Sequence, residues 1–88
     1  MRGLLGRDGL ARGEGLLLKP CGSVHTFFMR FPIDVVFLDR ELSVLAVRPD
    51  LPPWRTAGAR GAKVSLELAA GEAARLGFKP GMKLRLAA

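Results

Sequence analysis

The sequence contains no asparagine, glutamine or tyrosine, and it has a single cysteine, a single histidine and a single tryptophan. One cysteine rules out a disulfide within the chain, which fits a reducing compartment. The apolar runs are too short to span a bilayer. The N-terminal stretch MRGLLGRDGL lacks the apolar core and cleavage site of a signal peptide, so we expect a cytoplasmic protein. Missing amides are common in heat-adapted proteins, which suggests a thermophile, although a GC-rich genome biases composition the same way.

Length and charge narrow the class of protein further. Eighty-eight residues suit a single domain over residues 1–88 and leave no room for a second one. The net charge of +6 is uneven, because residues 45–88 carry eight Lys or Arg against three Asp or Glu, whereas residues 1–44 carry six against five. A basic half is typical of nucleic-acid binding. The basic residues are scattered singly, however, which fits better with arginines that protect strand edges.

The pattern of apolar residues predicts a mostly β fold. Short apolar or alternating runs indicate strands at residues 14–19, 24–29, 33–38, 43–47, 63–69 and 82–86. Residues 71–77 are the one convincing helical stretch, with Glu72 early, Arg75 late and Gly77 as the C-cap. We therefore expect a small β-barrel or sandwich of about six or seven mainly antiparallel strands, with one short helix before the last strand.

The stretch from Cys21 to Asp39 is predicted to form the two central strands, which meet at a break before Pro32. A proline cannot donate to a strand ladder, so this position should mark a bulge or corner. The proline-rich residues 48–61 are expected to form a long irregular loop. The alternation in residues 63–69 predicts a strand with Ser65 and Glu67 on a wet face.

Several motifs together resemble one known family. They are GLLGR near the start, GEGLLL, HTFFMRFPIDVVFLD, a PPW loop and LELAAGEAARLG, followed by a last strand led by glycine. This combination is similar to the domain-of-unknown-function 192 (DUF192) family across nearly the whole chain. The resemblance implies a compact, mostly β domain with a short helix before the last strand, and no established activity. The characteristic family residues map onto Phe28, Met29, Pro32, Asp34, Asp39, Gly71 and Gly77. The chain departs from the family at Gly81-Met82, where Gly-Asp is usual, so a role for an acidic group there is in doubt.

Cys21 and His25 are the first candidates for catalysis. They lie four residues apart, and a thiolate beside an imidazolium is an effective nucleophile. Asp34 is the best-placed residue to orient the histidine, and it is also a candidate general acid or base. The sequence favours the plainer interpretation, in which Cys21 and His25 are packed residues and Asp34 accepts backbone N–H groups at the Pro32 corner or pairs with Arg30.

The sequence predicts no metal and no cofactor. With one cysteine and one histidine, a metal site would need carboxylates such as Asp34 or Asp50 to complete its ligand set. The glycine-rich GARGA at residues 58–62 lacks the following helix and the Lys-Ser/Thr pair of a phosphate-binding loop.

The leading hypothesis is a non-enzymatic module that binds a small molecule or a protein. An aromatic beside a guanidinium suits anions, bases or a partner chain, although Trp54 would also fit as a lid over the strands. The expected pocket lies at the Cys21/His25/Asp34/Trp54 end of the fold, and its binding residues are His25, Arg30, Asp34, Trp54 and Arg55.

Two alternatives remain beside this hypothesis. The first is a small hydrolase or transferase that uses a Cys21–His25 pair. The second is weak nucleic-acid binding through the basic C-terminal half, which requires its arginines to gather on one face. We expect no membrane partner.

Overall fold

The structure, a computed structural model, describes residues 15–18, 23–25 and 30–84. Its elements in chain order are β1 (Gly15–Leu18), β2 (Ser23–His25), β3 (Ile33–Leu38), β4 (Val44–Leu51), β5 (Thr56–Gly58), β6 (Val64–Ala69) and α1 (Glu72–Leu76). Each strand pairing among them is antiparallel. The expected mostly β, antiparallel fold with one short helix is therefore confirmed. In the described ranges, no helix has the length and apolar character needed to cross a membrane.

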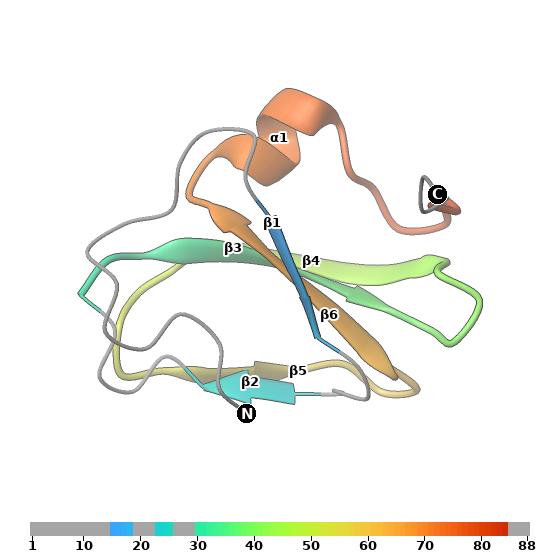
Figure 1. Cartoon of the computed structure of the whole chain (residues 1–88), viewed down its shortest axis with the longest axis horizontal. Coiled ribbons are helices and arrows are strands. Elements are labelled where there is room, and N and C mark those ends of the chain that lie inside the picture. The colour runs from blue at the N-terminus through green and yellow to red at the C-terminus, as the bar shows by residue number, and fades with distance from the viewer. Residues whose placement is uncertain (1–14, 19–22, 26–29, 85–88) are drawn as a thin grey trace.

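The described strands form two sheets (Figure 1). Four strands pair in the order β1-β6-β3-β4, and β2 pairs with β5 in a separate two-stranded sheet. Figure 1 shows α1 above the four-stranded sheet and the β2–β5 pair below it. Because β1 and β4 are the two edges of the larger sheet in the described part of the chain, this sheet is open. Of the two expected architectures, a barrel or a sandwich, the barrel is therefore wrong. The inner strands of the larger sheet are β6 and β3. The prediction of a central strand at residues 24–29 is therefore wrong for the part that β2 covers, because β2 belongs to the two-stranded sheet. Residues 26–29 lie outside the described part.

Two apolar clusters cover the two faces of β3. Alternation along this strand sends Ile33, Val35 and Phe37 to one face and Val36 and Leu38 to the other, and all five are completely buried. The first cluster also contains residues of β5 and the turn that follows it, residues 56–62, which we call the β5 segment. The second cluster also contains residues of β6 and α1. Layers on both sides explain why every residue of β3 except Asp34 is apolar, as is usual for a strand buried on both faces.

The proline-rich stretch is more regular than the sequence predicts. Instead of one irregular loop over residues 48–61, β4 continues to Leu51 and β5 occupies Thr56–Gly58. The expectation is wrong because β3 and β2 supply ladder partners that composition does not reveal. Pro49 is tolerated within β4 because this is an edge strand.

A hairpin loop joins β3 to β4 at the polar residues Asp39-Arg40-Glu41, which separate two apolar runs of the sequence. The Asp39 side chain accepts the N–H groups of Glu41 at 2.9 Å and Ser43 at 3.0 Å, and Leu42 takes a left-handed φ of 67°. The predicted last strand at residues 82–86 is described as far as Leu84. There Lys83 forms an isolated bridge with Ser43, and three backbone hydrogen bonds join residues 81–84 to Leu42 and Val44.

Candidate functional site

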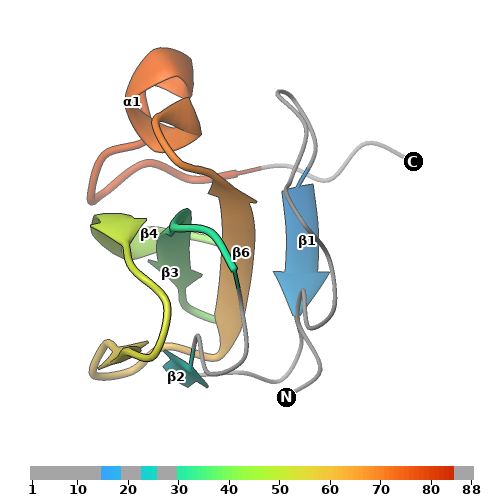
Figure 2. The same cartoon turned by 90° about the vertical axis from the view of Figure 1, so that its left-hand side faces the viewer.

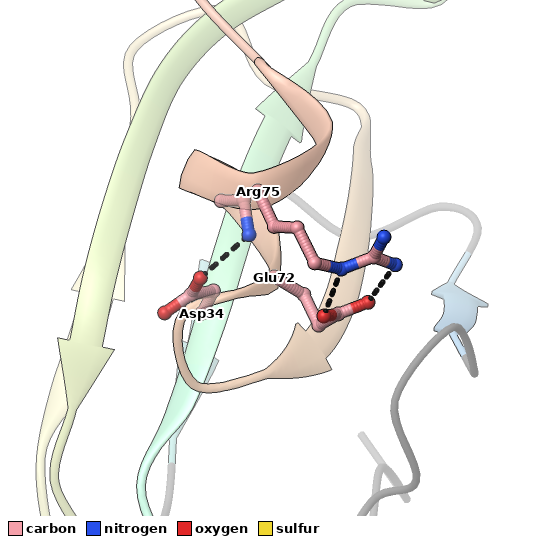
Figure 3. Close-up of polar contacts among 4 residues, drawn as sticks. Asp34, Glu72 and Arg75 are labelled. Carbon is pink, nitrogen blue, oxygen red and sulfur yellow. Dashed lines mark hydrogen bonds and ion pairs between the residues drawn. The ribbon is translucent and has the colours of Figure 1, made fainter.

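Asp34 lies on β3 and is completely buried. Its side chain is on the α1 side of the four-stranded sheet, because it is in register with Leu68 of the second cluster. Oδ1 accepts the N–H of Asp50 at 2.9 Å. Oδ2 accepts the N–H of Ala73 at 2.8 Å, and this bond is the dashed line that starts at Asp34 in Figure 3. Both carboxylate oxygens therefore bind backbone groups from two other elements.

Each of these backbone groups lacks a partner in its own element. The register of β3 with β4 shifts between Ile33 and Val35, and opposite this shift Asp50 takes a left-handed φ of 50°, so its N–H leaves the regular ladder. Ala73 is in the first turn of α1, where N–H groups have no acceptor within the helix, and the N-cap Gly71 has no side chain to supply one. Asp34 thus accepts the unpaired N–H of the bulge in β4 and caps the N-terminus of α1.

This geometry answers the question of what Asp34 does. The interpretation of Asp34 as a backbone acceptor is confirmed, but its partners are Asp50 and Ala73 rather than Arg30 or the Pro32 corner. Each carboxylate oxygen accepts a backbone N–H, and the side chain is buried, whereas a binding or catalytic role for Asp34 stays a prediction. His25 lies on β2, in the layer on the other face of the four-stranded sheet, so the structure does not bring Asp34 and His25 together.

A second acidic residue supports the same helix. Arg75 donates from Nε and Nη2 to the two carboxylate oxygens of Glu72, at 2.6 and 2.7 Å (Figure 3). The hydrogen bond to Glu72 raises the pKa of the Arg75 guanidinium. Glu72 is itself buried, so the guanidinium neutralises a carboxylate that has lost most of its water. This pair stabilises the first turn of α1 and has the geometry of a structural contact.

The other four predicted binding residues come to one end of the fold. β2 ends at His25 beside the start of β5, which directly follows Arg55. The beginning of β3, just after Arg30, lies beside the end of β4, just before Trp54. This end is on the left in Figure 1 and faces the viewer in Figure 2. We call Arg30, Trp54 and Arg55 together the Trp54 surface; all three side chains are exposed.

Trp54 has an unusual backbone for a large residue. It takes a left-handed φ of 63° in the turn after Pro53, and its side chain is 55% exposed. Proline followed by a residue of positive φ is the pattern of a type II turn, where glycine is preferred at the second position. A non-glycine residue there costs about 1 kcal/mol. The Nη1 of Arg55 donates to the Trp54 carbonyl at 3.3 Å, which places the guanidinium beside this turn. Turn geometry alone would thus select glycine, not tryptophan.

The proposed catalytic pair lies largely beyond what the structure describes. Cys21 is outside the described residues, and of His25 the structure describes the backbone position alone. The Cys21–His25 pair therefore stays a prediction. Within residues 15–18, 23–25 and 30–84, no group of three or more His, Cys, Asp or Glu side chains is close enough to hold a metal ion.

Glu67 is the residue that the sequence does not identify. The alternation of the sequence predicts Ser65 and Glu67 on a wet face of β6, but both are completely buried. The expectation is wrong because β6 is an inner strand, covered on both faces and flanked by β1 and β3. Neither carboxyl oxygen of Glu67 has a hydrogen-bond partner, and burial raises the pKa of this carboxyl to about 7. A charged residue in the middle of VSLELA was the available signal, yet alternation alone assigns it to solvent.

The fold and site define a small open-sheet β protein whose short helix is capped by a carboxylate from a neighbouring strand. The chain belongs to the DUF192 family, described as "Uncharacterized ACR", which it matches over residues 1–86. The resemblance found in the sequence is thus confirmed.

Two solved structures have a similar fold. One is a protein of unknown function from Novosphingobium aromaticivorans, with 29% identity and a TM-score of 0.83 over 93% of this chain and 64% of that chain. This chain therefore spans a little less than two thirds of its length. The other, from Sinorhizobium meliloti, is described as a "putative transcription regulator", with 25% identity and a TM-score of 0.81 over 91% of this chain and 67% of that one. No curated protein matches the sequence.

Proposed function

We propose that this chain is a non-enzymatic binding module that recognises an acidic segment of a protein partner through the Trp54 surface. The observation that carries the proposal is the backbone of Trp54, since an exposed indole occupies a turn position that favours glycine. Tryptophan and arginine are also the residues that most often dominate binding energy at protein interfaces.

Charge supports an acidic partner. Of the residues that the structure describes, the exposed charged ones near this end are Arg30, Arg48 and Arg55 against Asp50, three positive groups against one negative. Planar guanidinium groups pair with carboxylates through two parallel hydrogen bonds, and an indole offers a flat apolar contact beside them. The net charge of the chain, +6, adds long-range attraction.

A nucleic-acid partner is the second candidate, and one similar structure favours it through its description as a "putative transcription regulator". Single strands bind to exposed aromatics flanked by basic groups, as at the Trp54 surface. The other basic residues argue against a continuous track. Arg60 and Lys63 follow β5, at its far end from Arg55, whereas Lys83 lies 3.9 Å from Glu41 beside the β3–β4 turn.

The test uses the single tryptophan of the chain. Because the sequence has one tryptophan and no tyrosine, intrinsic fluorescence reports on Trp54 alone. We expect a polyglutamate peptide to shift this emission saturably, with affinity that falls as salt rises. A polylysine peptide of equal length should have no effect. Tighter binding of a single-stranded oligonucleotide than of polyglutamate would overturn the acidic-protein proposal in favour of the second candidate, and no response to either probe would reject both.

Matched substitutions then locate the site. Anisotropy of a labelled polyglutamate peptide should show that Arg55→Ala weakens binding about tenfold, whereas Arg60→Ala, an exposed arginine after β5, leaves it unchanged. Trp54→Gly should abolish measurable binding while keeping the unfolding free energy within about 1 kcal/mol of the wild type, because glycine relieves the left-handed backbone. Equal losses for Arg55→Ala and Arg60→Ala would show that net charge, not the Trp54 surface, binds the peptide.

A further inference from the structure

Glu67 is a buried acid without a described structural role. It lies on the inner strand β6, is completely buried, and neither of its carboxyl oxygens has a hydrogen-bond partner. In folded proteins, nearly all buried polar groups have a hydrogen-bond partner, and burying an ionised carboxylate without a partner is especially unfavourable. Asp34, on the neighbouring strand, shows the usual solution, with both oxygens bonded.

Among the residues that the structure describes, the register neighbours of Glu67 supply no compensating charge. Its register partner on β3 is Val35, and its register partner on β1 is Leu16. One strand further along the same row, on β4, is Arg48, which is exposed to solvent. The charged residues associated with α1, namely Asp34, Glu72 and Arg75, belong to the other side of the four-stranded sheet.

The face that carries Glu67 is the one on which the β5 segment packs. Val35 belongs to the cluster of Ile33, Val35, Phe37 and Ala62, and the residues packed against this cluster include Ala57 and Ala59. β5 itself pairs with β2 alone, whose only ionisable residue is His25, so these small apolar contacts join the two-stranded sheet to the larger one. β5 starts directly after Arg55. The packing on this face therefore positions the Trp54 surface.

We propose that Glu67 controls the Trp54 surface by its ionisation: the neutral carboxyl allows the β5 segment to pack, and the carboxylate loosens it and weakens binding. A charged carboxylate on this face requires water, and in the described part of the chain the layer packed on this face contains β2 and β5, two strands of three residues each that open easily. The part of this inference that concerns binding rests on the proposed function, whereas the loosening of β5 does not.

The direction and range of the effect follow from burial. Burial raises the pKa of Glu67 from 4.5 to about 7, so the neutral form prevails in mildly acidic solution and the carboxylate prevails above neutrality. If the opened state solvates the carboxyl fully, the opening equilibrium of β5 rises up to about 30-fold between about pH 5.5 and about pH 8.

Hydrogen exchange tests the loosening without any ligand. We expect the amides of Thr56–Gly58 and Ala59, corrected for their intrinsic rates, to lose protection toward about pH 8 in the wild type and to keep it in Glu67→Gln, which stays neutral. Amides of β3 should change far less in both proteins. Equal pH dependence of β5 protection in wild type and variant would overturn the inference.

Two further measurements separate the possible failures. An NMR titration of the Glu67 side chain in the wild type needs no variant, so the inference stays testable even if Glu67→Gln does not fold; a midpoint near 4.5 would overturn it. Binding of labelled polyglutamate should weaken above neutrality in the wild type and less so in Glu67→Gln. Loss of β5 protection with no polyglutamate binding at any pH would reject the proposed function and retain the loosening of β5.

Discussion

Asp34 and Asp39 are the same residue type in the same role, and they differ in burial. Each accepts two backbone N–H groups, but Asp34 is completely buried whereas Asp39 lies at a hairpin turn and is partly exposed. When a buried acceptor is removed, water cannot reach its donors to take its place. The donors then lose their hydrogen bonds and carry the full free-energy cost of desolvation. At an exposed turn, water takes over the lost bond.

This contrast gives a prediction at the scale of one residue. Asp34→Ala should lower the free energy of unfolding by about 3 kcal/mol, because it leaves the N–H groups of Asp50 and Ala73 without a hydrogen-bond acceptor. Asp39→Ala, the matched control, should lower it by about 1 kcal/mol or less. Urea unfolding of the three proteins measures both values. A similar loss for the two variants would mean that burial does not govern the role of Asp34.

At the scale of the element, the stability of α1 depends more on the contacts at its two ends than on hydrogen bonds within the helix. It has five residues, and its two flanking glycines, Gly71 and Gly77, both have positive φ. The N–H of Gly77 donates to the carbonyl of Ala74, and the N–H of Phe78 reaches back to Ala73, which closes the helix in the manner of a Schellman ending. A helix this short has no stability of its own in water.

The prediction for this element concerns Gly77. A Cβ at this position meets no atom within 4 Å, so substitution acts through the backbone alone, whose φ is 77°. Gly77→Ala should therefore lower the free energy of unfolding by about 1 kcal/mol, and Gly77→Asn by less, because asparagine tolerates left-handed conformations. Urea unfolding distinguishes the two variants. An alanine variant as stable as the wild type would contradict the left-handed ending of α1.

At the scale of the whole molecule, Glu67 makes stability depend on pH. Between pH 4.5 and about 7 the folded state keeps a proton that the unfolded chain has released. Stability therefore falls as pH rises through this range, by about 3 kcal/mol in total, and this cause adds no further loss above it. Urea unfolding at about pH 5 and about pH 8 should show this loss in the wild type and not in Glu67→Gln. Parallel pH profiles for the two proteins would contradict it.

The sequence predicts much of this architecture, because the local patterns of apolar, turn and glycine residues agree with the strand pairing of the structure. The apolar run at residues 33–38, the polar turn at Asp39 and the glycine after the helix each indicate an element that the structure contains. The position of β2 was not predictable, because periodicity indicates a strand without indicating its partner. Closure into a barrel likewise depends on which strands lie at the edges, and a single sequence does not carry this information.

The candidate site was predicted in part. Trp54 and Arg55 stand out in the sequence because an aromatic and a guanidinium follow two prolines, and the backbone brings them to the end that also holds Arg30. Asp34 was recognised as a backbone acceptor, but its partners lie 16 and 39 residues away, beyond any local pattern. Glu67 was placed in solvent because alternation assumes one wet face, and an inner strand with two covered faces has none.

The two hydrogen bonds of Asp34 also suggest an order of folding events. Ala73 can dock on Asp34 only after β3 and β6 have paired, since this pairing places Asp34 opposite Leu68, a few residues before the helix. α1 is too short to form alone, so it is absent until the sheet presents its acceptor. We therefore expect the helix to form late in folding and to be among the first elements to open, after long-range strand pairing, which is intrinsically slow.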